Sequence, residues 1–150
     1  PIFVARQLQK HEYMPWNEIS RRYVDSDPEF YEPQEWRGRA EDKKQGSDGI
    51  VFISDDIVED LYDDIFARYK LLLDLGVCPE QARMILPQST MTEWYWSGSL
   101  YAFAKMCSLR TSSDAQYESK KVASKISDTM LSLYPVSWNA LRTTMYKGDE

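Results

Sequence analysis

The segment that most constrains the fold is SDDIVEDLYDDIFARYKLLLDLG, residues 54 to 76. It begins with a serine suited to cap a helix, carries acids in the first turn and ends at a glycine. Its apolar side chains recur at helical spacing, at positions Ile57, Leu61, Ile65, Tyr69 and Leu72. The pattern predicts a long amphipathic α-helix.

Prolines and apolar spacing divide the rest of the chain. A short helix is predicted over residues 1–9, with a buried strand as the competing interpretation of residues 2–4. Further helices are predicted over 79–86, 99–110, 112–133 and 136–146. A strand is predicted over 17–24, and a strand or extended segment over 90–98. Residues 25–49 are rich in proline, acids and glycine, and predict a surface loop with at most a helical turn near 34–39. The fold class is α+β, dominated by helices.

Composition excludes several functions. A chain of 150 residues with a net charge of −6 predicts one domain, residues 1–150, without a broad nucleic-acid surface. One histidine and two distant cysteines do not supply a metal site, and two cysteines fit free thiols in a reducing compartment. No apolar run has membrane-spanning length and no signal peptide is recognisable, so we expect a cytoplasmic protein. A glycine-rich phosphate loop is also missing from the sequence.

The stretch KHEYMPWNEISRRYVD, residues 10 to 25, is unusually rich in polar groups and holds the only histidine. If residues 17–24 form a strand, Glu18, Ser20 and Arg22 share one face. That face is either a solvated surface or a site for an anion.

Two other arginines have similar alternatives. Arg83 lies in an apolar segment and needs a partner or an anionic ligand. Arg110 ends a predicted helix, where the helix dipole favours a cation in any case. The aromatic run at residues 94–96 is more typical of a core or subunit interface than of a stacking platform.

The ordered motifs resemble a known family. PIFVARQ, then KH, NEISRRY, ARMILP, TEWYWSGSL, LR and AQYE occur in the order and spacing of the flavin-dependent thymidylate synthases. The resemblance implies a helix-dominated fold with an antiparallel sheet and an enzyme, a flavoprotein methyltransferase. It also implies conversion of dUMP to dTMP, with methylenetetrahydrofolate as carbon donor, FAD reduced by NADPH, and a homotetramer with shared active sites.

The resemblance also assigns residues. Those implied for the nucleotide are Gln7, Glu18, Ser20, Arg21, Arg22, Arg83 and Arg110. Those implied for the flavin are Lys10, His11, Glu12, Asn17, Ser99, Lys105 and Leu109. His11, Ser20 and Arg110 are the residues expected to act in catalysis, Ser20 by orienting the nucleotide without a covalent role. Cys78 and Cys107 do not look activated as nucleophiles.

The chain also departs from the family pattern. Where the family usually has Arg-His-Arg, this chain has Lys10, His11 and Glu12, so one positive charge is reversed. Family members usually carry a further portion ahead of PIFVARQ, so we expect these residues to be the larger, C-terminal part of such a protein. A non-catalytic relative that binds dUMP or acts as an assembly subunit is the alternative to the enzyme.

Overall fold

The computed structural model describes the chain except for residues 23–25, 42–46, 55 and 146–150. Within the described residues the helices are α1 (Ile2–Leu8), α2 (Asp56–Asp74), α3 (Pro79–Ala82), the 3-10 turn η1 (Arg83–Ile85), α4 (Leu100–Arg110), α5 (Tyr117–Leu133) and α6 (Pro135–Met145). The strands are β1 (Trp16–Glu18), β2 (Trp36–Arg39), β3 (Ser47–Val51) and β4 (Trp94–Trp96). In the part of the chain described, β1 pairs with β4 and β2 with β3 in small antiparallel sheets. The predicted helix-dominated α+β class is confirmed.

The chain forms two compact units. The first consists of Pro1–Ala5, Asn17–Trp36 and Ile50–Tyr95, and the second of Arg6–Trp16, Arg37–Gly49 and residues 96–150. The single domain expected from the length stays a prediction.

In the first unit, α2 packs against α3 and η1. Tyr69 is the residue of α2 that is buried, and Tyr62 donates a hydrogen bond to the carbonyl of Tyr31 at 3.2 Å. Gly76 ends the helix in a left-handed conformation with φ of 85°, which suits glycine. The predicted helix and its stop are confirmed, but Ile57 and Leu61 of the predicted apolar face are exposed.

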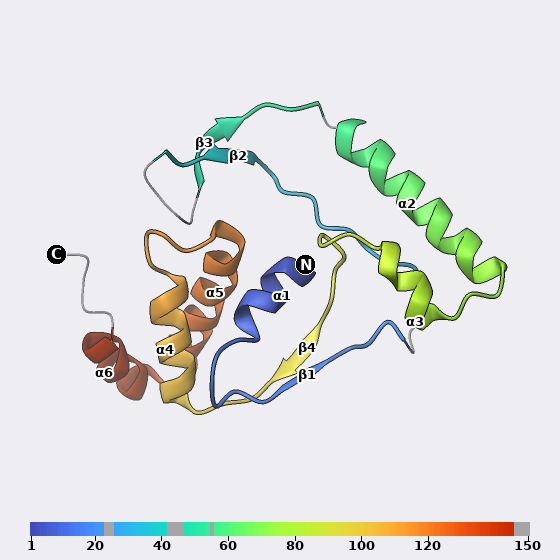
Figure 1. Ribbon diagram of the computed structural model, residues 1–150. Coiled ribbons are helices and arrows are strands. Elements are labelled where there is room, and N and C mark those ends of the chain that lie inside the picture. Colours follow the sequence, from blue (N-terminus) through green and yellow to red (C-terminus); the bar gives the residue numbers. More distant parts are fainter. Residues whose placement is uncertain (23–25, 42–46, 55, 146–150) are drawn as a thin grey trace. The chain divides into compact units, whose positions relative to one another are not determined.

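In the second unit, α4, α5 and α6 pack against one another (Figure 1). Their shared core includes the fully buried Met106, Ala123 and Trp138. The indole of Trp138 donates to the Ser127 hydroxyl at 3.2 Å, so the polar edge of this large side chain is satisfied inside the core. Trp96 is half-buried and packs edge-on against the rings of Trp16 and Phe103, whereas Tyr95 of the same aromatic run is 82% exposed.

Three predictions about local structure are wrong. The strand predicted over 17–24 ends at Glu18, and the chain turns at Arg21 and Arg22, while residues 23 and 24 lie outside the described part. The predicted loop over 25–49 contains β2 and the start of β3. The helix predicted from 112 begins at Tyr117, because residues 112–115 form turns, with Ala115 N–H bonded to the Ser112 carbonyl at 3.2 Å.

The observed boundaries of the other helices agree closely with the predicted ones. The segment 79–86 is helical as predicted, but its second half tightens into η1. Pro79 occupies the first turn of α3, where its missing N–H leaves no hydrogen bond unmade. In the described residues, no helix is both long enough and apolar enough to pass through a lipid bilayer.

Candidate active site

Arg110 joins two predicted site residues in the second unit. As the last residue of α4, it donates from Nε to Nε2 of His11 at 3.0 Å and from Nη2 to the carbonyl of Gln7 at 2.9 Å. Gln7 lies in α1, and His11 follows soon after the end of that helix. Folding thus brings together residues that are about a hundred positions apart in sequence, and all three are half-buried.

The surroundings of His11 keep its imidazole neutral. Burial lowers the pKa of His11 below its ordinary value of 6.5, and the positive charges of Arg110 and Lys105 lower it further. Because Nε2 accepts a hydrogen bond from Arg110, the proton of the neutral ring lies on Nδ1. His11 therefore presents one N–H donor and no charge at neutral pH.

The amide of Gln7 is fixed by the start of α5. Ser119 donates to Gln7 Oε1 at 2.9 Å, and Gln7 Nε2 donates to Gln116 Oε1. Gln116 in turn donates to Glu118 Oε2 at 3.1 Å. Residue-level prediction missed Gln116 and Ser119, although AQYE, one of the motifs that carry the family resemblance, contains Gln116 and ends at the residue before Ser119.

An ion pair anchors this chain of hydrogen bonds. Arg37 of β2 donates from Nη2 to Glu118 Oε1 at 2.5 Å, and the two side chains are only 21% and 9% exposed. Arg37 also bonds the Ser47 hydroxyl at 2.7 Å and lies over the ring of Tyr117. Burial raises the pKa of Glu118, but hydrogen bonds from Arg37, from the backbone and from Gln116 outweigh it, so the pKa lies below 4.5. Glu118 is therefore a carboxylate at neutral pH.

Other residues predicted for the flavin lie in the same unit. Lys10, Glu12, Lys105 and Leu109 are exposed. Ser99 caps α4, and its Oγ accepts a hydrogen bond from the N–H of Ala102 at 3.1 Å. The serine hydroxyl at this position therefore has a role in the helix apart from any contact with a flavin. Asn17, by contrast, lies in the first unit, where it is exposed on β1.

The residues predicted for the nucleotide lie mostly in the first unit. Glu18 Oε1 accepts a hydrogen bond from the Thr92 hydroxyl at 2.8 Å, and Arg22 Nε donates to the Ser20 hydroxyl at 3.0 Å. Ser20 and Arg22 are thus in contact, as predicted, but through the turn after β1 instead of along a shared strand face. Thr92 was not predicted, and its hydroxyl orients the Glu18 carboxylate.

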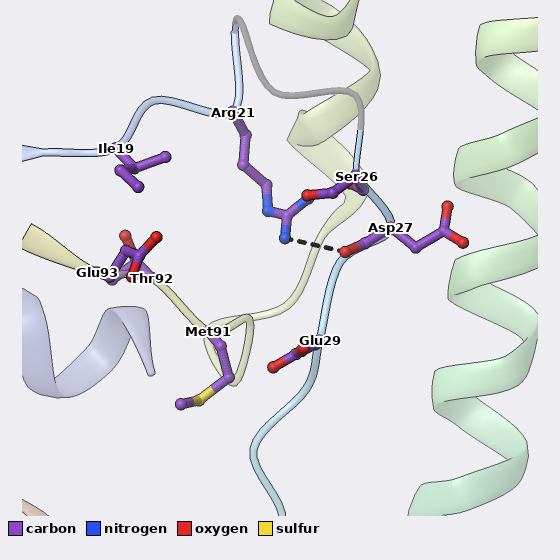
Figure 2. A pocket seen from close by; sticks show the side chains of 8 residues that line it. All are labelled: Ile19, Arg21, Ser26, Asp27, Glu29, Met91, Thr92 and Glu93. Atoms are coloured by element: carbon purple, nitrogen blue, oxygen red, sulfur yellow. Dashed lines mark hydrogen bonds between the residues drawn. The ribbon is translucent and has the colours of Figure 1, made fainter.

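Arg21 lines a pocket of about 530 Å³ in the first unit (Figure 2). Its guanidinium donates to the carbonyls of Ser26 at 2.9 Å and Asp27 at 3.3 Å, which ties the loop after β1 to its start. The described lining is Ile19, Arg21, Ser26, Asp27, Glu29, Met91, Thr92 and Glu93. Three of these residues carry carboxylates, which repel an anion, and Arg21 carries a guanidinium. Within this described lining, an anionic ligand would therefore bind at Arg21.

Arg83 is exposed at the start of η1. Its Nε donates to the carbonyl of Glu80 at 3.2 Å, so the partner that an arginine in an apolar segment requires is a backbone oxygen of the preceding turn. One Arg83 nitrogen is used in this bond, and a guanidinium has further N–H donors for a ligand.

The sequence model described as Thymidylate synthase complementing protein matches residues 1–136. The chain belongs to this family. It is 35% identical over 150 residues to a flavin-dependent thymidylate synthase of Thermus thermophilus, covering 99% of this chain and 56% of that protein. It is 36% identical over 157 residues to the flavin-dependent thymidylate synthase of Kosmotoga olearia, covering 99% of this chain and 67% of that one.

Solved structures agree with the sequence comparison. The chain superposes on the UMP/dUMP methylase PolB from Streptomyces cacaoi, in a crystal structure with 5-Br dUMP, with a TM-score of 0.79 and 29% identity. The match covers 97% of this chain and 68% of PolB. The chain spans just over half the length of the Thermus relative that it matches. The family and its fold, as the sequence predicted, are confirmed.

Proposed function

We propose that the protein is a flavin-dependent thymidylate synthase, an enzyme that methylates dUMP reductively to dTMP. Its carbon donor is methylenetetrahydrofolate, and its FAD is reduced by NADPH. Membership of the family over residues 1–136 carries this proposal. The relatives from Thermus and Kosmotoga carry the same activity in their names, and PolB was crystallised with a dUMP analogue.

The residues around His11 fit a flavin nucleotide. Lys10, Lys105 and Arg110 supply positive charge in the second unit, which suits the diphosphate of FAD, and Leu109 offers an exposed apolar side chain. Arg110 Nε lies 3.0 Å from His11 Nε2, and the positive charge of Lys105 also lowers the pKa of this imidazole. We assign Lys10, His11, Glu12, Asn17, Ser99, Lys105 and Leu109 to the flavin. Bound FAD supplies the reducing equivalents that form the methyl group.

The chain's own residues bind and orient. His11 carries its proton on Nδ1 and stays uncharged, so it can donate one hydrogen bond from Nδ1. Because the ring has no charge, the anionic groups of a ligand are left to the arginines. Arg110 keeps that ring in place and is itself aligned by the carbonyl of Gln7. An N–H donor fixed in this way can stabilise negative charge that develops on an oxygen or nitrogen of a bound flavin or uracil ring.

We assign the nucleotide to Gln7, Glu18, Ser20, Arg21, Arg22, Arg83 and Arg110. Planar guanidinium groups bind phosphate through paired hydrogen bonds and can also donate to the uracil carbonyls. Ser20 and Glu18 orient the substrate, and Thr92 keeps the Glu18 carboxylate in place. Ser20 has no covalent role in this proposal.

Assembly and location extend the proposal. We infer a homotetramer with shared active sites in the cytoplasm. Large apolar side chains such as Tyr95, Val136 and Phe52 are more than four-fifths exposed, which favours burial against other subunits. A membrane or nucleic-acid partner is not part of the proposal.

The test is anaerobic incubation of the full-length protein with dUMP, methylenetetrahydrofolate, NADPH and FAD, followed by chromatography for dTMP. We expect dTMP from the native protein and much less from Arg22→Ala. Arg39→Ala, which removes an exposed arginine of β2 outside the assigned set, is the matched control and should remain active.

The non-catalytic relative is the second candidate. The observation in its favour is the carboxylate of Glu12, beside His11, at a position where the family usually carries a positive charge. Glu12 is exposed, which allows the charge to remain in water and away from a bound cofactor. A folded protein that binds dUMP but forms no dTMP would favour this candidate, and Glu12→Arg would then be the first reversion to assay.

A further inference from the structure

Helix α2 carries an apolar stripe that the described residues of the chain leave uncovered. Ile57, Leu61, Leu71 and Leu75 are 63%, 53%, 55% and 72% exposed. Leu75 follows the last residue of α2, but its N–H bonds the Leu71 carbonyl at 3.0 Å, which continues the helical pattern. This stripe is distinct from the buried side of the helix, where Tyr69 lies.

The spacing of the stripe is that of a helix-pairing seam. Positions 57, 61, 64, 68, 71 and 75 alternate by four and three residues, the spacing that keeps side chains on the face toward a partner helix. Asp64 and Arg68 occupy the two central positions and form an exposed ion pair, with Arg68 Nε 2.8 Å from Asp64 Oδ2. The seam extends for about 27 Å along the helix.

The order of residues along this seam is self-complementary. It runs apolar, apolar, acid, base, apolar, apolar, and the midpoint is position 66. When a second copy lies antiparallel about that midpoint, Ile57 faces Leu75 of the partner subunit and Leu61 faces Leu71 of the partner subunit. Asp64 then faces Arg68 of the partner subunit, and the reciprocal pair forms as well. A twofold axis demands this matching of a surface with itself.

Charge selects the antiparallel arrangement. In the described part of α2, the half before position 66 carries Asp56, Glu59, Asp60, Asp63 and Asp64 and no base. The following half carries Arg68 and Lys70 with a single acid, Asp74. A parallel pair would set the two acidic halves side by side, whereas an antiparallel pair sets each acidic half beside the half that carries the bases. The many carboxylates also disfavour an anionic lipid surface as the occupant.

We propose that the α2 stripe is a twofold interface with the α2 helix of a second copy of this chain, held in register by Asp64 and Arg68. Polar residues at single positions of an apolar seam commonly fix register in this way, because a shifted partner leaves them unmatched. An exposed ion pair within one helix contributes little by itself, so the central charges are explained better by pairing across the axis. The proposal names one surface of the assembly inferred above, but it rests on α2 and does not require activity.

Charge reversal gives the first test, on the full-length protein, with mass measured by light scattering across a dilution series. Arg68→Asp and Asp64→Arg each place like charges opposite one another, so each variant should dissociate at this interface at roughly tenfold higher concentration than the native protein. Mixing the two variants restores both opposite-charge pairs and should restore the larger species. The double variant Asp64→Arg with Arg68→Asp should associate like the native protein.

Asp63→Arg is the matched control, because it makes the same charge change one position off the seam and should leave the mass unchanged. Circular dichroism before mixing shows whether the helices are intact, and the recovery on mixing holds even if one variant alone is less stable. The proposal is overturned if the single reversals keep the native mass, or if they dissociate and mixing recovers nothing. The first result would mean that the stripe docks a different protein, and the second that the two charges do not face each other across a twofold axis.

Cysteine cross-linking tests register and direction. In a Cys78→Ser background, since Cys78 is the exposed native cysteine, a protein with Leu61→Cys is mixed with one that carries Leu71→Cys. Disulfide-linked dimers should form in the mixture and in neither protein alone. Leu61→Cys mixed with Leu75→Cys is the off-register control. Cross-links within each single variant would instead indicate a parallel pair and contradict the proposal.

Discussion

Replacing Glu118 by glutamine should destabilise the second unit, because this carboxylate connects β2 to the start of α5. It accepts from Arg37 at 2.5 Å and from Gln116 at 3.1 Å, and its side chain is 9% exposed. The glutamine has nearly the same volume but no charge. Its carbonyl oxygen can accept from one of the two donors, but its NH2 group is a donor itself and leaves the other without an acceptor. The hydrogen-bond chain that holds Gln7 loses its anchor at the same time.

The magnitude follows from the degree of burial. Removing one partner of a fully buried ion pair costs about 3–5 kcal/mol, and a hydrogen bond to a charged group contributes about 1.5–3 kcal/mol. Arg37 is one-fifth exposed and keeps its contacts with Ser47 and the Tyr117 ring, so the lower range applies. We therefore expect a loss of about 2 kcal/mol, which corresponds to a fall of about 1 M in the urea midpoint.

The loss should depend on pH in a defined direction. The pKa of Glu118 is lower in the folded protein than its ordinary value of 4.5, so the unfolded chain binds the proton more readily. The stabilisation by the carboxylate is therefore complete above pH 4.5 and disappears as pH falls through the pKa of the folded state. The urea midpoints of the native and variant proteins should converge in that acidic range.

Urea titrations followed by circular dichroism at neutral and acidic pH provide the assay. Asp128→Asn, which neutralises an exposed acid of the same helix, is the matched control and should change the midpoint little. Equal midpoints for Glu118→Gln and Asp128→Asn at neutral pH would refute the reasoning.

Three further predictions concern the proposed site. Arg110→Gln removes a charged hydrogen-bond donor from the His11 imidazole, so the pKa of this imidazole should rise toward 6.5. NMR titration of the chain's single histidine measures this pKa. An unchanged pKa would contradict the role given to Arg110 in keeping His11 neutral. In the native protein the lowered pKa makes stability decrease as pH falls below 6.5. Thr92→Val should weaken dUMP binding by roughly three- to tenfold in calorimetry, because Glu18 loses its hydroxyl partner, and equal affinity would argue against this role. Arg22→Ala should cost about 2–5 kcal/mol of dUMP affinity, and undiminished binding would remove Arg22 from the site.

The helices were the most predictable part of the fold. In α2, the acids of the first turn, the apolar period and Gly76 all act locally, so they identify the helix without knowledge of its neighbours. The exposure of Ile57 and Leu61 was not predictable in this way. Periodicity shows which side chains are apolar, but which of them the rest of the chain covers depends on tertiary packing.

The missed strands have a tertiary origin as well. WRGR and SDGIV, residues 36–39 and 47–51, combine glycine with charges and have weak strand propensity. Arg37 gives a reason for the pairing, because it bonds Ser47 on β3 and Glu118 on α5. Neither contact leaves a signal in the local sequence.

The candidate site divides in the same way. The residues of the family motifs were found because their order along the chain is distinctive. The partners that orient them, Thr92 for Glu18 and Ser119 for Gln7, lie 74 and 112 positions away in sequence. Such partners are selected by geometry, so only the folded chain reveals them.

The most direct test of the proposed activity follows the methyl carbon. The full-length protein is incubated without oxygen with dUMP, NADPH, FAD and methylenetetrahydrofolate deuterated at its methylene carbon, and the nucleotide is analysed by mass spectrometry. The account predicts dTMP whose methyl group carries the deuterium of the donor. Recovery of unchanged dUMP from a folded protein that holds both FAD and dUMP would contradict it.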